Sequence, residues 1–335
     1  MAEGLSLASE FTVPPFSILD ARKGDWAMRK KRWIALGIES ELGREGSLAY
    51  SASCQSAAVY RAREEYETKV GRKVSMKEFL AANPGQYRHT GTSVFDPVLA
   101  ELMVSWFSAP DDVVLDPFAG GSVRGVVASM LGRDYVGVEL RAEQVAANRA
   151  QGIRICGDRQ PAWICGDSLK ELDGVPNGLD MILTCPPYGS LEVYSRDPRD
   201  LSQMRAHEFD AAYSAILQKA VGCIADDRFA VIVVGNYRDS KTGTLRDLRA
   251  LTVAAMVNAG AALYNEAILL TSVGSLAMRA RNQMRATRKL GRCHQEVLIF
   301  VKGDPKRATT RLGQTVPYEF PKGRLGTSSS DDLGL

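Results

Sequence analysis

Hydrophobic positions follow two periods across the middle of the chain. Between residues 113 and 301, short runs of β-branched and aliphatic residues alternate with longer segments in which apolar residues recur every three or four positions. The short runs predict buried strands, and the longer segments predict amphipathic helices that cover them. The expected strands are residues 113–115, 135–138, 163–165, 181–184, 229–234, 263–270 and 296–301.

The expected helices between these strands are residues 123–131, 142–150, 208–224 and 245–258. In the third helix, Phe209, Tyr213, Ile216 and Val221 recur at helical spacing and form one apolar stripe for the sheet. Strands that alternate with helices predict an α/β fold, a doubly wound and mostly parallel sheet of seven strands.

The two ends of the chain differ from this middle part. Residues 1–90 contain a basic stretch with Trp26 and Trp33 and two charged helical segments, so we expect a helical basic extension there. The α/β domain is expected to occupy residues 91–303. Residues 304–335 are rich in Gly, Pro, Ser and Asp and contain little apolar surface, which predicts a disordered polar tail.

Composition narrows the class of protein. The chain has 335 residues, of which 45% are hydrophobic and 24% charged, as in ordinary globular domains. No apolar run approaches the roughly 18 residues that span a bilayer. The N-terminus lacks a basic segment followed by an apolar one, so a cytoplasmic protein is expected. The six cysteines form no Cys-x-x-Cys pair and the three histidines lack ligand spacing, so no disulfide framework and no metal site are expected.

The first expected strand ends in a glycine-rich turn. Asp116 closes the strand, Gly120 and Gly121 allow a ligand to approach the backbone, and Glu139 closes the second strand. An acidic residue at the latter position binds the ribose hydroxyls of an adenosine cofactor in doubly wound folds. The dinucleotide fingerprint is absent, and the Asp116 carboxylate would repel a pyrophosphate but attract an ammonium and a sulfonium. The turn therefore favours S-adenosylmethionine over NAD; the alternative is a purely structural turn.

Another acidic residue follows the third expected strand. Asp167 ends the sequence Ile-Cys-Gly-Asp and is placed to accept a hydrogen bond from an adenine amino group. Asp158 ends an earlier copy of the same four residues and is the competing candidate. Asp167 is preferred because residues 162–165 form the better strand.

Four motifs stand in order at the ends of successive expected strands: DPFAGGSVRG, GVEL, CGDSL and LTCPPY. Together they resemble the S-adenosylmethionine-dependent amino-methyltransferases of DNA, as found in bacterial or phage restriction-modification systems, over about residues 90–303. The resemblance implies a methyltransferase sheet, S-adenosylmethionine as cofactor and double-stranded DNA as partner. It assigns to the cofactor Thr92, Ser93, Asp116, Pro117, Phe118, Gly120, Glu139 and Asp167. It assigns to catalysis Cys185, Pro186, Pro187 and Tyr188.

The catalytic motif fits the chemistry of an exocyclic amino group. Such a nitrogen is a poor nucleophile, because its lone pair is conjugated into the ring. Acceptors for both of its hydrogens free the lone pair for in-line attack on a methyl sulfonium. The resemblance assigns one acceptor role to the carbonyl of Pro186 and gives Tyr188 a face on which a flipped-out base stacks.

The other acceptor position carries Cys185, where the family has Asp, Asn or Ser. A thiol accepts hydrogen bonds weakly and is most similar to the Ser variant, which favours cytosine N4 over adenine N6. One alternative is that Cys185 is a covalent nucleophile for methylation at cytosine C5, although enzymes of that kind carry the cysteine after a proline. Another is a buried cysteine beside an unrelated turn.

Two basic segments are candidates for contacts with DNA. Arg281, Arg285, Arg288 and Arg292 would line one face of a helix and meet phosphates; the alternative is a solvated face. Residues 29–32 are either a phosphate clamp or a surface helix.

The hydroxyl residues at positions 92 and 93 also have two possible roles. They either contact the cofactor carboxylate or cap the helix that follows.

Three functions remain open from the sequence. The first is a DNA amino-methyltransferase, the second is a methyltransferase acting on RNA or on protein glutamine, and the third is a DNA-binding protein that has kept the fold and lost activity. The planar amide of glutamine and the amino groups of bases suit the same loop, which is why the second function stays open.

Overall fold

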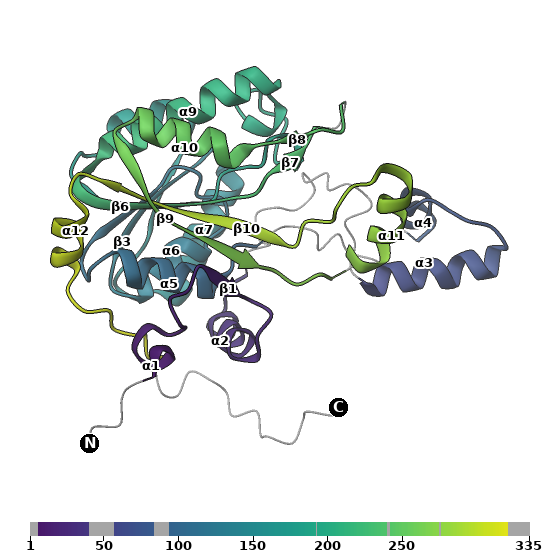
Figure 1. Ribbon diagram of the computed structural model, residues 1–335, viewed down its shortest axis with the longest axis horizontal. Coiled ribbons are helices and arrows are strands. Elements are labelled where there is room, and N and C mark those ends of the chain that lie inside the picture. The colour runs from purple at the N-terminus through teal and green to yellow at the C-terminus, as the bar shows by residue number, and fades with distance from the viewer. Residues whose placement is uncertain are drawn as a thin grey trace.

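A mixed sheet forms the centre of the computed structural model (Figure 1), which describes residues 6–39, 57–83, 94–191, 193–239, 242–274 and 276–320. The eight strands of the sheet are β1 Ile18–Asp20, β2 Val113–Asp116, β3 Asp134–Glu139, β4 Ala162–Cys165, β5 Leu179–Thr184, β6 Ile224–Val234, β9 Ala261–Leu270 and β10 His294–Lys302. A separate hairpin pairs β7 Tyr237–Arg238 with β8 Leu245–Arg246.

The strand order is β1-β9-β10-β6-β5-β2-β3-β4. All neighbours are parallel except at β10, which runs antiparallel to both β6 and β9. The predicted doubly wound, mostly parallel α/β fold is therefore confirmed. The chain adds an eighth strand from its N-terminal region, because β1 pairs with the end of β9 through Ile18 and Ile268.

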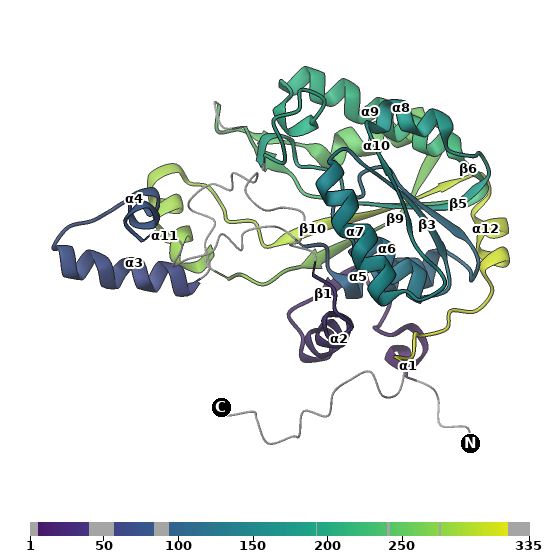
Figure 2. The same ribbon diagram turned by 180° about the vertical axis from the view of Figure 1, so that it is seen from behind.

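Helices cover both faces of the sheet (Figures 1 and 2). One apolar core joins the sheet to helices α2 Gly24–Ala35, α5 Pro97–Phe107, α6 Val123–Met130, α7 Ala142–Ile155 and α12 Pro305–Leu312. The opposite core joins it to α9 Ala206–Cys223 and α10 Leu248–Asn258. The remaining short helices are α1 Leu7–Phe11, α8 Ser168–Glu171 and three 3₁₀ turns, Leu172–Gly174, Gly189–Leu191 and Leu201–Gln203. No helix among the described residues is both long and apolar enough to cross a membrane.

Segments on both sides of the expected α/β domain pack against its core. In the N-terminal region, Trp33 is fully buried and α2 packs on α5, so this segment belongs to the main core. At the other end, residues 304–320 are folded rather than a disordered tail. Tyr318 stacks on Trp33 with ring centroids 5.1 Å apart, and Phe320 meets the same indole edge-on. These two aromatic rings supply the apolar surface that composition did not indicate.

A small lobe extends from the sheet beyond β9 and β10 (Figures 1 and 2). It consists of α3 Ala57–Val70, α4 Met76–Ala82 and α11 Leu276–Thr287, and we call it the distal lobe. Its core contains Val59, Val74 and Phe79, and Met278 of α11 packs against them. Two segments far apart in the sequence thus share one apolar cluster next to the sheet edge.

Candidate active site

The carboxyl ends of β2, β3, β4 and β5 open into one cavity of about 360 Å³. Parallel strands place their carboxyl ends at the same edge of the sheet, and the strand order reverses direction between β2 and β5 there. The predicted site residues that line this cavity are Pro117, Phe118, Gly120, Glu139, Asp167, Cys185, Pro186, Pro187 and Tyr188. The glycine loop of residues 117–122 and the loop of residues 185–188, which we name the cofactor loop and the catalytic loop after their predicted roles, therefore share one cavity.

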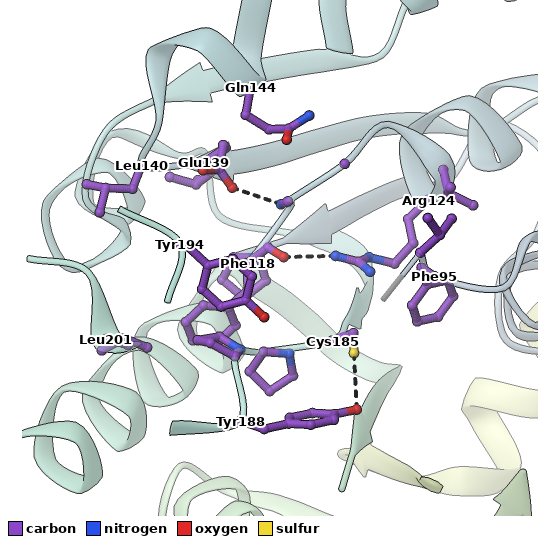
Figure 3. Close-up of a pocket in the computed structure, with 18 of the residues that line it drawn as sticks. Phe95, Phe118, Arg124, Glu139, Leu140, Gln144, Cys185, Tyr188, Tyr194 and Leu201 are labelled. Atoms are coloured by element: carbon purple, nitrogen blue, oxygen red, sulfur yellow. Dashed lines mark hydrogen bonds between the residues drawn. The ribbon is translucent and has the colours of Figure 1, made fainter. Parts of the chain in front are cut away.

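Glu139 at the end of β3 connects two loops of the cavity. Its Oε2 accepts a hydrogen bond from the backbone N–H of Gly120 at 3.0 Å, and its Oε1 accepts one from the N–H of Arg141 at 2.9 Å (Figure 3). Gly120 has φ +53°, a left-handed conformation that suits glycine. The carboxylate lines the cavity wall, where it is an acceptor for hydroxyl donors of a ligand.

Asp167 lines the cavity beyond the end of β4. Its Oδ1 accepts a hydrogen bond from Leu169 N at 3.0 Å and caps α8. The competing candidate Asp158 lies after α7 and is not among the lining residues. Of the two candidates, only Asp167 lines the cavity, and its Oδ2 has no hydrogen-bond partner among the residues that the structure describes.

The sequence led us to expect Asp116 to face a ligand, but its side chain does not line the cavity. Its side chain is fully buried, and both carboxylate oxygens already have partners. Oδ1 accepts from Thr184 Oγ1 at 2.6 Å and from Phe118 N at 3.1 Å. Oδ2 accepts from Arg124 Nε at 2.6 Å and from the Tyr135 hydroxyl at 2.8 Å. Arg124 therefore neutralises the charge of Asp116, and the hydrogen bonds of Asp116 hold the glycine loop on the strands. The Asp116 carboxylate does not attract a cationic ligand directly.

The catalytic loop follows β5 and forms the floor of the cavity in Figure 3. The Tyr188 hydroxyl lies 3.5 Å from the Cys185 sulfur and accepts a hydrogen bond from Gln295 Nε2 at 2.6 Å. Burial, together with the neighbouring Cys185, raises the pKa of Tyr188 well above its ordinary value, so the phenol stays protonated. One edge of the ring packs over Gly235, where a Cβ would lie 3.2 Å from it. The ring is thus held in place by Gly235, which directly follows β6, and by Gln295 on β10.

The four arginines expected on one helical face do not form it. Helix α11 ends at Thr287, and Arg288 takes a left-handed φ of +56°. Arg292 forms an ion pair with Glu296 and donates to the carbonyl of His294, beside the catalytic loop. Arg281 and Arg285 lie exposed on α11, so the basic face is shorter than the arginine spacing indicates.

The N-terminal basic stretch, for which a phosphate clamp and a surface helix were both open, lies on helix α2. Arg29 pairs with the buried Glu101, and Lys30 Nζ lies 3.0 Å from Asp96 Oδ2. Both acids belong to or cap α5, which α2 covers. Arg29 and Lys30 thus hold α2 on α5, whereas the next two residues, Lys31 and Arg32, lie exposed on the same helix. This arrangement fits the surface-helix alternative better than a clamp made of all four cations. Thr92 and Ser93 lie outside the described residues.

Comparison with known proteins adds to the geometry. Residues 24–149 match the model of a family described as DNA methylase. This part of the chain is similar to the DNA methylases. Two curated relatives are the type II methyltransferase M.HinfI of Haemophilus influenzae and M.XycI of Xanthomonas campestris pv. cyanopsidis. The first is 38% identical over 80 residues, 23% of this chain and 22% of the relative. The second is 42% identical over 62 residues, 18% of this chain and 21% of the relative.

The chain spans about a fifth of the length of these curated relatives. Among solved structures, TrmN from Thermus thermophilus is 17% identical, with a TM-score of 0.42, 62% of this chain covered and 49% of that chain. The recognised resemblance to DNA methylases is confirmed. The DNA methylase match contains the glycine loop and Glu139, and it ends before Asp167 and the loop that begins at Cys185.

Two residues of the site were missed from the sequence. Arg124 lines the cavity and is nearly buried, and its signal is a basic residue within an otherwise apolar helix. Gln295 lies on β10, more than a hundred residues after the loop that it contacts. No local pattern indicates that contact. Among the described residues, no group of three or more His, Cys, Asp or Glu side chains could hold a metal ion.

Proposed function

We propose that this protein transfers a methyl group from S-adenosylmethionine to the exocyclic amino group of a base flipped out of double-stranded DNA, cytosine N4 in preference to adenine N6. The observation that carries the proposal is the shared cavity, in which the Cys185 loop lies beside Glu139 and Asp167. The match of residues 24–149 to the DNA methylase model supports DNA as the substrate.

The cavity fits an extended nucleoside cofactor. Asp167 on the β4 side would accept a hydrogen bond from the adenine amino group, and Glu139 on β3 would accept bonds from the ribose hydroxyls. Phe118 and Leu140 supply apolar walls between them. When bound there, S-adenosylmethionine would supply an electrophilic methyl group next to the end of β5.

The catalytic loop would prepare the amino nitrogen for attack. The carbonyl of Pro186 and the sulfur of Cys185 would accept its two hydrogens, which releases the lone pair from the ring. The methyl group that S-adenosylmethionine supplies would be transferred to this nitrogen, which would lose one proton to water. Pro187 stiffens the loop, and the ring of Tyr188 offers its face to the flipped base.

Cys185 carries the preference for cytosine N4. Its thiol is a weak acceptor, closest in kind to the serine hydroxyl associated with that reaction. The thiol also lies 3.5 Å from the Tyr188 hydroxyl, so a hydrogen bond between them orients the sulfur. An oriented sulfur fits an acceptor role and leaves the carbonyl of Pro186 as the stronger acceptor.

The distal lobe is our candidate for contact with DNA. Arg281 and Arg285 on α11 and Arg288 after it are exposed, and no described acidic side chain pairs with them. Such guanidinium groups bind phosphates and release counterions. The lobe is joined to the sheet by β9 and β10, and β10 also carries Gln295, which contacts the catalytic loop. A DNA duplex held by the lobe would therefore stay close to the cavity mouth.

The decisive experiment measures transfer of labelled methyl from S-adenosylmethionine to unmodified duplex DNA, followed by nucleoside mass spectrometry. We expect N4-methylcytosine as product and unchanged or higher activity in Cys185→Ser. The matched control is Cys156→Ser, at the end of α7 outside the cavity lining. Absence of label in all DNA tested contradicts the proposal. Complete loss in Cys185→Ser with 5-methylcytosine as wild-type product indicates a covalent thiol instead.

A further inference from the structure

Arg124 has an unusual position for a charged side chain. It lies in the first turn of α6, directly after the glycine loop, and only 5% of it is exposed. It nevertheless lines the cavity. A nearly buried cation at the wall of a ligand cavity requires an explanation, because burial of an unpaired charge is costly.

Two of the three guanidinium nitrogens have partners. Nε donates to Asp116 Oδ2 at 2.6 Å, and Nη2 donates to the carbonyls of Phe118 at 2.8 Å and Ala119 at 3.0 Å. The carbon of the guanidinium lies 4.6 Å from the ring centroid of Phe95. These contacts fix the plane of the group, as Figure 3 shows for its position between Phe95 and Phe118.

The third nitrogen, Nη1, has no hydrogen-bond partner among the described residues, and it is not among the fully enclosed polar atoms that lack one. It is therefore accessible, and the space next to Arg124 is the cavity. A guanidinium nitrogen held in a fixed plane with free N–H donors is a ready partner for a carboxylate.

The place of Arg124 along the sheet indicates which part of a ligand would meet it. Asp167 lies after β4 and Glu139 after β3, whereas the loop contacted by Arg124 follows β2, next to Cys185 after β5. A cofactor with adenine and ribose at the first two positions brings its amino-acid end over the β2 loop. That end is a zwitterion whose carboxylate needs a donor.

We propose that Nη1 of Arg124 binds the carboxylate of the amino-acid end of the cofactor, which rests on the proposed function through the identity of that cofactor. The Asp116 carboxylate neutralises the buried charge of Arg124 without occupying Nη1. The site therefore selects ligands that carry this carboxylate by a directed hydrogen bond, and not by a net positive potential.

Lys30 is another cation that lines the cavity, as are Arg141 and Arg199. Its ammonium lies 3.0 Å from Asp96 Oδ2, and its side chain is 40% exposed. A solvated ammonium on a flexible stem provides a weaker and less directed contact than the fixed guanidinium. Lys30→Met is therefore the matched control for a cation at the cavity wall.

The test compares two ligands by calorimetry. S-adenosylmethionine carries the carboxylate, and decarboxylated S-adenosylmethionine keeps the ammonium and the sulfonium but lacks it. We expect the wild-type protein to bind the first about 10- to 100-fold more tightly, the range of one charge-assisted hydrogen bond. Arg124→Met should lose this preference, and Lys30→Met should retain it.

Arg124→Met leaves Asp116 buried without a cation and can unfold the protein, so the double variant Asp116→Asn with Arg124→Met is measured as well. This variant removes both charges together, and it should also bind the two ligands equally. If the folded double variant still prefers S-adenosylmethionine to the decarboxylated ligand, the proposal is overturned. It is also overturned if Lys30→Met loses this preference.

The outcome is separable from that of the proposed function. A wild-type protein that binds neither ligand refutes the cofactor and the proposal together. A protein that binds S-adenosylmethionine through Arg124 but transfers no methyl group to DNA supports this proposal and contradicts the substrate proposed above.

Discussion

Gln295 on β10 donates a hydrogen bond to the hydroxyl of Tyr188 at 2.6 Å and so ties the catalytic loop to the antiparallel strand of the sheet. The same hydroxyl lies 3.5 Å from Cys185. The position of the ring over which a base would stack is thus set by a strand that is remote in sequence. Because β10 continues toward the distal lobe, a movement of that lobe on a bound duplex would reach Tyr188 through this residue.

Gln295→Leu should lower the rate of methyl transfer while leaving cofactor affinity unchanged. The substitution leaves the half-buried Tyr188 hydroxyl without this donor, and the loss of one such hydrogen bond costs about 0.5–1.5 kcal/mol. Steady-state kinetics and urea denaturation measure the two effects. In a protein that already carries Tyr188→Phe, Gln295→Leu should change the free energy of unfolding very little. If the two substitutions instead lower the stability additively, the two side chains are not coupled.

Asp116→Asn should strongly destabilise the fold. It leaves the Arg124 guanidinium buried without a counter-charge, a change that typically costs about 3–5 kcal/mol. Equilibrium denaturation in urea gives the free energy of unfolding. Adding Arg124→Met should recover part of the loss, because no unpaired charge then remains. An Asp116→Asn variant as stable as the wild type would refute the structural role assigned to this ion pair.

Stability should fall in alkali because of buried phenols. Burial raises the pKa of Tyr188 and that of Tyr135 well above the ordinary tyrosine value of 10.0. Between that value and the folded pKa, the unfolded chain loses protons that the folded protein keeps. The free energy of unfolding is therefore highest below about pH 10 and decreases as the pH rises above it. Denaturation at pH 8 to 11 measures this slope, and Tyr188→Phe should reduce it.

Arg281→Ala with Arg285→Ala should weaken DNA binding without weakening cofactor binding. If each arginine contacts one phosphate, the slope of log affinity against log salt should fall by about 2. Fluorescence anisotropy with duplex DNA over a salt series measures the slope. Arg307→Ala on α12, an exposed arginine paired with Asp227 at the far side of the sheet, is the control. An equal change in that control would contradict a specific role for α11.

The position of the cofactor loop was predictable, because local patterns determine where a parallel strand ends. Glu139 ends one strand and Asp167 follows the next, so the edge of the sheet at which they meet follows from the connectivity. The same holds for the loop at Cys185. Asp116 also stands at a strand end, but the presence of Arg124 changes its role. Whether a carboxylate faces a ligand depends on its partners. Asp116 and Arg124 are eight positions apart, and the glycine loop and the start of α6 lie between them, so no local pattern indicates the pair.

The sequence by itself determined the doubly wound sheet, the order of its strands' motifs and the residues at the mouth of the cavity, since apolar periodicity and strand-end acids are local signals. Only the tertiary structure decided that Arg124 neutralises Asp116, that Gln295 orients Tyr188, that Arg292 is paired with Glu296, and that Tyr318 completes the core around Trp33. Each of these contacts arises from side chains brought together by packing, so hydrogen bonds and ion pairs across the fold, rather than local propensity, select the partner.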